Sequence, residues 1–353
     1  MDLSWLIENF NDAGSATIGG GVTGFLFGVA AQRSRFCLRS ATIEFWHGSF
    51  GPKTAVWLLA FGAALLGVQL LFSADILDAA SVRQLSTPGS LSGAVIGGLM
   101  FGSGMILARG CASRLLVLSA TGNLRALITG LILTVVAQAS LRGVLSPARL
   151  KLASLWLVGP ETRNLMDHLP NNSGLAAGLA ILALAAGMAL RHKFSTPLIA
   201  TSLMVGIAVT AGWWFTATLA SQSFDIVAVQ SVSFTGPTAD TLMAVVNQPN
   251  LSLGFGLGLV PGVFAGSFVA SLMADDFHIQ TFNEQAPLPR YIAGACLMGF
   301  GSMLAGGCAV GAGMTGGAVL ALTAWIALVC MWLGAGLTDL LIDRRPRQLV
   351  VNR

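Results

Sequence analysis

The stretch Gly102-Ser-Gly-Met-Ile-Leu-Ala-Arg-Gly-Cys111-Ala112 returns in the second half of the chain as Gly299-Phe-Gly-Ser-Met-Leu-Ala-Gly-Gly-Cys308-Ala309. Aligned without a gap, seven of the eleven positions match. The repeat indicates a duplication that puts a thiol at the same place in each half. Because each copy lies in an apolar stretch interrupted by glycine, it favours a membrane protein whose centre is built from broken helices and lined by cysteines.

The composition of the chain agrees with a membrane protein. Of its 353 residues, 54% are hydrophobic and only 10% are charged, and the mean hydropathy is +0.76. A soluble domain carries roughly 25% charged residues. The 43 glycines allow the close helix contacts that are common in lipid. The basic residues are scattered, so the net charge of +4 predicts no binding of nucleic acid.

The hydrophobic pattern predicts an all-α polytopic membrane protein with about nine transmembrane helices, because a spanning helix needs about 20 apolar residues. The first, third and eighth are short or broken by glycine. Two shorter apolar pieces, 150–158 and 224–246, are predicted to be re-entrant or interfacial, which implies a polar centre. The nine predicted spans are 17–31, 54–72, 92–108, 124–141, 174–190, 197–219, 251–273, 290–305 and 317–337.

The chain is predicted to be one integral-membrane transport domain, 1–353, with repeat halves of roughly 16–150 and 195–340 around a cysteine-lined path. A weak match of Gly24–Gly28 with Gly254–Gly258 puts Cys37 opposite Ser267. The basic tail 341–353 is predicted to be cytoplasmic and the N-terminus, which lacks Lys and Arg up to residue 11, to lie outside. The sequence leaves open whether the halves are inverted.

Arginines accompany two of the five cysteines. Cys37 ends the phrase Arg33-Ser-Arg35-Phe-Cys37, and Arg109 and Arg114 flank Cys111. One interpretation is an electropositive mouth that attracts an anion, with Arg35 and Arg109 as candidates, and a helix beginning at Cys111–Ser113 would add free N–H groups. The alternatives are an interfacial anchor for the arginines and plain packing for the cysteines. Packing is preferred for Cys296 and Cys330.

The stretch 231–238 is polar and rich in turn residues. Ser233 and Thr235 are candidates for lining the path, either as hydroxyl donors or at a helix N-terminus; an external loop is the alternative. The spacing of the cysteines predicts no metal site and no disulfide framework. We expect no cofactor, no catalytic residue and no direct use of ATP, since no phosphate-binding loop occurs.

The phrases Arg35-Phe36-Cys37, Gly110-Cys111-Ala, Gly307-Cys308-Ala and Ser233-Phe-Thr-Gly-Pro237 together resemble the YeeE/YedE family of bacterial inner-membrane sulfur transporters, over about 16–340. The resemblance implies about nine helical spans with short helices meeting centrally, and uptake of thiosulfate. It implies that three cysteines are needed, at positions matching Cys37, Cys111 and Cys308. It also implies a separate TusA-like sulfur-carrier protein as partner. Arg109, opposite Gly306, departs from the pattern and would alter the choice of substrate.

The function that we expect is a permease of the bacterial inner membrane, not an enzyme. It would pass thiosulfate or a related small sulfur anion between Cys37, Cys111 and Cys308 by weak S–H···S contacts. A neutral thiol offers a weak donor and a soft sulfur, whereas a thiolate would repel the dianion. Open alternatives are a membrane sulfurtransferase that forms a cysteine persulfide for a soluble carrier, a transporter of selenium compounds, and a soft-metal channel.

Overall fold

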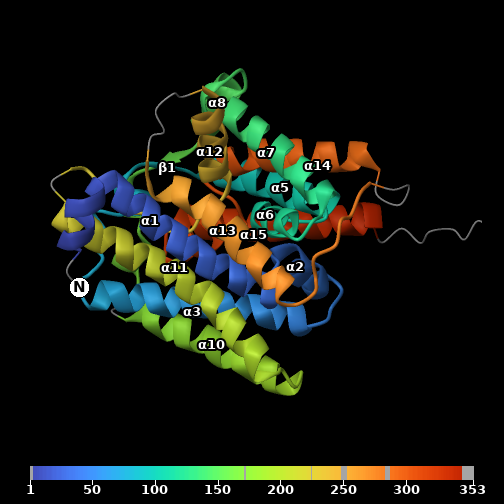
Figure 1. Cartoon of the computed structure of the whole chain (residues 1–353), viewed down its shortest axis with the longest axis horizontal. Helices are drawn as coiled ribbons and strands as arrows, with labels where there is room; N and C mark the ends of the chain where they lie inside the picture. The colour runs from blue at the N-terminus through green and yellow to red at the C-terminus, as the bar shows by residue number, and fades with distance from the viewer. Residues whose placement is uncertain (1–2, 171, 224, 248–252, 283–286, 344–353) are drawn as a thin grey trace, which may run out of the picture.

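A computed structural model describes residues 3–170, 172–223, 225–247, 253–282 and 287–343 of the protein. In this part of the chain, nine helical segments are long and apolar enough to cross a membrane (Figure 1). The described strands are two residues each, β1 (Gly89–Ser90) and β2 (Leu157–Val158), paired antiparallel. The predicted all-α polytopic fold is therefore confirmed.

Six of the nine spans are single helices, and three are helices that break and continue. The broken spans are the first, third and eighth, but the predicted ranges 17–31, 92–108 and 290–305 are helical almost to their ends, and each break lies at or just beyond the end of the predicted range. The single helices are α3 (Pro52–Ser73), α7 (Leu124–Arg142), α10 (Ser173–Arg191), α11 (Thr196–Gln222), α13 (Phe255–Leu272) and α15 (Leu322–Thr338). The broken spans are α1 (Ser4–Arg33) with α2 (Leu38–Trp46), α5 (Leu91–Leu107) with α6 (Ala112–Ala120), and α14 (Leu288–Leu304) with the π-helix η2 (Ala309–Gly316).

The π-helix η3 (Asp339–Asp343) directly continues α15 at the end of the ninth span. Short helices lie between the other spans: α4 (Arg83–Ser86), α8 (Ser146–Ala153), α9 (Pro160–Arg163), η1 (Leu165–His168) and α12 (Thr235–Asn247). The apolar piece 150–158 divides into the end of α8 and the strand β2. In the piece 224–246, the described residues 225–234 have no regular structure, and α12 follows them. Most of the predicted tail, from residue 344 on, lies outside the described residues.

The start of the first span was predicted too late. The helix begins at Ser4 and not near residue 17. Asn11 divides it into a short first part and the long part that contains the predicted span. Asn11 leaves the helical conformation, with φ 55° and ψ 176°, and its Oδ1 accepts a hydrogen bond of 2.8 Å from the N–H of Gly14. The Asn11 side chain thus caps the second part of the helix. The first part, residues 4–10, is too polar to be recognised as a span from its hydropathy.

The two helices with the repeated phrase cross each other in opposite directions. Gly97 of α5 lies against Gly301 of α14, and Gly104 lies against Gly294, so closely that a Cβ on any of the four would meet the partner's backbone. Glycine is therefore required at this crossing, as in other close contacts between membrane helices. The crossing makes α5 and α14 an antiparallel pair in which the start of each helix lies beside the end of the other.

By contrast, α1 and α13 run in the same direction. Gly20 faces Phe255 and Leu259, while Gly28, further along α1, faces Val263 and Ser267. Since the helices of the repeated phrase are antiparallel, α1 and α13 are not equivalent parts of the same duplication. The alignment that set Cys37 opposite Ser267 is therefore wrong. In Figure 1, α3 and α10 lie side by side along one edge of the molecule, and α7 and α14 lie near the opposite edge.

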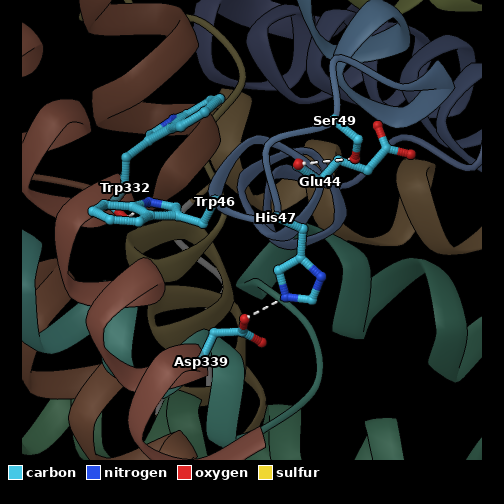
Figure 2. A network of polar contacts seen from close by, with 6 residues as sticks. All are labelled: Glu44, Trp46, His47, Ser49, Trp332 and Asp339. Atoms are coloured by element: carbon cyan, nitrogen blue, oxygen red, sulfur yellow. Dashed lines mark hydrogen bonds and ion pairs between the residues drawn. The ribbon is translucent and has the colours of Figure 1, made fainter. Parts of the chain in front are cut away.

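Polar contacts fasten the ends of the first and last spans to each other (Figure 2). The Trp46 Nε1–H donates to the carbonyl oxygen of Trp332 at 3.1 Å, and His47 Nε2 lies 2.8 Å from the buried Asp339 Oδ2. Glu44 Oε2 accepts a hydrogen bond of 2.9 Å from the N–H of Thr54, at the start of α3. The outer end of α2 is therefore held by both α15 and α3.

At the other end of α15, Arg163 joins three segments. Its Nη1 donates to the Thr87 carbonyl oxygen at 2.8 Å and its Nε to Thr323 Oγ1 at 3.1 Å. Burial, with a smaller effect of the nearby Arg83, lowers the pKa of Arg163 to about 10. The guanidinium is therefore still charged at neutral pH and keeps its donors.

Candidate functional site

Each broken span turns in the same way two residues before a cysteine. The turning residues Arg35, Arg109 and Gly306 all have left-handed backbone, with φ of 52°, 56° and 82°. In the Schellman motif that ends many helices, one residue is left-handed, and the N–H of the next residue donates to the carbonyl oxygen five residues before it. These backbone hydrogen bonds join Phe36 N to Ala31 O at 3.1 Å, Gly110 N to Met105 O at 3.1 Å and Gly307 N to Ser302 O at 2.8 Å.

The cysteine after each turn is the N-cap residue of the next short helix. Cys37 precedes α2, Cys111 precedes α6 and Cys308 precedes η2. The Cys308 Sγ accepts a hydrogen bond of 3.4 Å from the N–H of Gly311, three residues on. The sulfurs of Cys37 and Cys111 lie next to the N–H groups three residues on in their own helices. Because helix N-termini carry partial positive charge, all three thiols lie where an anion is stabilised.

The structure brings two of the three thiols into contact. The Cys37 and Cys111 side chains meet, and Cys111 Sγ lies 3.3 Å from Ser113 Oγ. All three cysteines are free and buried, with 8%, 1% and 0% of Cys37, Cys111 and Cys308 exposed. Cys308 lies in the other half, at the start of η2, and this short helix packs against α6.

The segment before α12 also enters the interior. The Val232 carbonyl oxygen accepts a hydrogen bond of 2.6 Å from Thr315 Oγ1, and the Ser233 side chain lies directly over Gly311, in the helix that Cys308 caps. Thr235 is fully buried at the start of α12, and its Oγ1 has no hydrogen-bond partner. The alternative of an external loop is therefore wrong for Ser233 and Thr235.

The arginines separate into exposed and buried ones. Arg35 and Arg109 are exposed at their turns, so the left-handed position is filled by a charged residue twice and by glycine once. Arg35 is close enough to influence Arg114 electrostatically, as are Cys37 and Cys111. Arg114 is partly exposed as a whole, but its Nη1 is buried without a hydrogen-bond partner.

Sequence reasoning noted Arg114 only as a neighbour of Cys111 and did not select it. The signal that identifies it is its place three residues after Cys111, because residues three apart share a face of a helix. Cys330 packs against Gly98 of α5, in agreement with a packing role. Among the described residues, no group of three His, Cys, Asp or Glu side chains lies together in a way that could hold a metal ion.

Within the described ranges, nine spans occur and three of them break at buried thiols. This arrangement is typical of a polytopic membrane protein of the transporter class, because discontinuous helices build the substrate sites of many transporters. The chain matches the family model described as "Sulphur transport" over residues 33–337. It belongs to this family, the YeeE/YedE proteins.

Three curated relatives are similar to this chain. It is 26% identical to the "Thiosulfate transporter TsuA" of Escherichia coli (strain K12), over 95% of this chain and 97% of that protein. It is 27% identical to the "Thiosulfate transporter TsuA" of Spirochaeta thermophila, over 89% and 95%. A shorter match, 33% identical over 25% of this chain, is to the "Probable transporter YedE" of Salmonella typhimurium. The protein is therefore a transporter of sulfur compounds and not an enzyme.

Proposed function

We propose that the protein is a permease that takes up thiosulfate or a closely related sulfur anion across the bacterial inner membrane. The observation that carries the proposal is the set of three buried thiols, each at the N-terminus of a short helix inside a broken span. Two relatives that align along most of this chain are named thiosulfate transporters.

Thiols suit the passage of such an ion because they bind it weakly. An ion that permeates must bind tightly enough to enter the path and weakly enough to leave it. Several weak binding sites in series meet both requirements. The terminal sulfur of thiosulfate accepts an S–H···S contact from a neutral thiol, and the helix N-termini offset part of the lost hydration. Contact between Cys37 and Cys111 gives one step of a relay, and Cys308 on η2 gives the next.

Positive charge attracts the anion to this relay. Arg35 and Arg109 are exposed and raise the local concentration of anions, as charged mouths do in other proteins. Arg114 then offers a buried N–H beside the first two thiols. The hydroxyls of Ser233 and Thr235 line the path on the side of Cys308.

The sulfurtransferase alternative has less support. A cysteine nucleophile needs a base that activates it. The groups that act on Cys37 and Cys111 are each other, serines and Arg114, none of which is a general base at neutral pH. We further propose that a separate TusA-like carrier receives the sulfur after uptake, while the protein itself forms no persulfide.

The test is uptake of labelled thiosulfate by a sulfur-auxotrophic strain that carries single variants. Cys37→Ala, Cys111→Ala and Cys308→Ala are each expected to reduce uptake to background, whereas the matched control Cys296→Ala, on α14, keeps it. Normal uptake by Cys111→Ala contradicts the proposal. Growth on selenium and other sulfur sources identifies the substrate, and a persulfide on Cys37 with release of sulfite favours the sulfurtransferase.

A further inference from the structure

Thr235 stands in the second half where Cys37 stands in the first. The segments 30–37 and 228–235 align without a gap, as Ala-Ala-Gln-Arg-Ser-Arg-Phe-Cys37 and Ala-Val-Gln-Ser-Val-Ser-Phe-Thr235, and share Ala, Gln and Phe. Cys111 follows Cys37 by 74 residues, and Cys308 follows Thr235 by 73. The alignment of the two Gly-Cys phrases therefore extends back to these segments if one half has a single additional residue between them.

The packing of the helices has the same two-fold pattern. If α1, α2, α3, α5, α6 and α7 correspond to α11, α12, α13, α14, η2 and α15, the major contacts among these twelve helices have counterparts. Thus α1 packs on α13 as α11 packs on α3, and α5 packs on α15 as α14 packs on α7. In the same way, α2 packs on α3 as α12 packs on α13. The helix α10 has no counterpart in this scheme.

The glycine crossing gives the direction of the symmetry. Adding the offset between the two phrases turns Gly104 into Gly301 and Gly97 into Gly294. The observed contacts, Gly104 with Gly294 and Gly97 with Gly301, therefore exchange with each other. Two contacts between antiparallel helices that exchange in this way are related by a two-fold axis perpendicular to the helices. Inverted repeats have such an axis.

The aromatic side chains place both segments at one point. The ring of Phe27 meets Phe36, next to Cys37, at a centroid distance of 6.4 Å and Phe234, next to Thr235, at 5.1 Å. Phe36 and Phe234 are the aligned phenylalanines of the two segments. Thr235 therefore enters the interior beside the same residue as Cys37, and each begins or caps a short helix.

The hydroxyl of Thr235 is an exception among the buried threonines. Thr216 Oγ1 bonds the Gln230 carbonyl oxygen at 2.7 Å, and Thr315 Oγ1 bonds that of Val232 at 2.6 Å. Thr235 is equally buried, yet its Oγ1 has no partner. Burying a hydroxyl without a partner is unfavourable, so buried polar groups without a partner are rare. A ligand that accepts a hydrogen bond at this point explains the exception.

We infer that Thr235 is the fourth substrate-binding position, the counterpart of Cys37 in an inverted second half, and that its hydroxyl donates to an oxygen of a sulfur oxyanion. This inference rests on the proposed uptake of such an ion. Three positions then offer S–H to a soft sulfur atom, and one offers O–H, a stronger donor, to a hard oxygen. The site thereby requires an ion with both kinds of end and orients it.

The experiment compares thiosulfate uptake by Thr235→Val, which keeps the shape and removes the hydroxyl, with Thr235→Ser. The control Thr315→Val removes a buried hydroxyl that already has a partner. Thr235→Val is expected to raise the KM for thiosulfate about five- to tenfold, the effect of one lost hydrogen bond. Thr235→Ser is expected to stay within about twofold of the original protein. Competition by sulfate and sulfite, which have oxygens but no terminal sulfur, should weaken in Thr235→Val.

Thermal unfolding of the same purified variants separates binding from structure. Without substrate, Thr235→Val should unfold at the same or a higher temperature, because an unpartnered hydroxyl is removed, whereas Thr315→Val should unfold at a lower one. An unchanged KM in Thr235→Val overturns the inference, even when the cysteine variants lose uptake. If Thr235→Val does not reach the membrane, the KM values of Thr235→Ala and Thr235→Ser are compared instead, and equal values overturn the inference. Failure of the proposed function itself appears instead as normal uptake by the cysteine variants.

Discussion

Arg114 brings a positive charge into the protein beside two thiols. Its buried Nη1 has no hydrogen-bond partner, and the ion pair formed among the described residues is elsewhere, between His47 and Asp339. A charged group within a span is costly and usually serves a substrate path. The carboxylate of Asp276 is close enough to act on this charge, but Nη1 has no acceptor, and an anion beside Cys37 and Cys111 would supply one.

We predict that Arg114→Gln lowers kcat/KM for thiosulfate about tenfold or more, because a hydrogen bond to a charged group contributes about 1.5–3 kcal/mol. Arg114→Lys keeps the charge but not the planar pair of donors, so it should recover only part of the activity. Initial uptake rates over a range of thiosulfate concentrations check this. The control is Arg125→Gln, on α7, whose exposed guanidinium bonds Gln280. Full activity of Arg114→Gln contradicts the role.

At the scale of elements, the unit of the site is a turn followed by a capped helix. The repeated phrase encodes both parts: a residue that tolerates left-handed backbone, and a cysteine two residues later that caps the next helix. The first broken span has the same two parts without the glycines, which is why the repeat alone does not reveal Cys37. A side chain at the left-handed position is strained, and Arg35 and Arg109 accept that strain.

The strain predicts the effect of substituting the glycine turn. Gly306→Ala should reduce the free energy of unfolding by about 1–2 kcal/mol, because an L-residue is disfavoured at positive φ. The cost belongs to the backbone alone, since a Cβ at Gly306 meets no atom within 4 Å. Gly187→Ala is the control, because Gly187 is equally free of contacts but lies in the regular helix α10. Thermal unfolding in detergent measures both, and equal stability of the two variants would contradict the argument.

The sequence predicts the spans well because apolar runs of the right length have few other uses. It predicts two of the three breaks, because the repeated Gly-Cys phrase marks them, whereas the first break, at Arg35, contains no glycine. It does not predict the segment from Ser4 to Asn11, where polar residues mask a helix, nor the equivalence of Cys37 and Thr235, where one thiol became a hydroxyl. Arg114 is visible as a residue, but its orphaned N–H requires coordinates. The features that the sequence does not predict are those that depend on packing between segments far apart in the chain.

For the whole molecule, the odd number of spans puts the two ends of the described chain on opposite sides of the membrane. Consecutive spans alternate in direction, which the parallel pair α1 and α13 and the antiparallel pair α5 and α14 both satisfy. The positive-inside rule then predicts that the side with the end of α15 faces the cytoplasm.

We predict an external N-terminus and a cytoplasmic C-terminus. A fluorescent protein that matures only in the cytoplasm should fluoresce when fused after residue 353. An epitope fused before residue 1 should be digested by protease added to spheroplasts, while an epitope in 191–193 should be protected. The opposite pattern would reverse the assignment and place Arg35 on a different face.

The fastening of His47 to Asp339 and of Trp46 to Trp332 has a consequence for synthesis on the ribosome. His47 and Asp339 are 292 residues apart in the chain, so α2 leaves the ribosome long before the helix that secures it. At about 5–20 residues per second, that interval lasts roughly 15–60 seconds. During this time the far end of α2 waits in an unfinished bundle, and its attachment to the last span becomes one of the last steps of assembly.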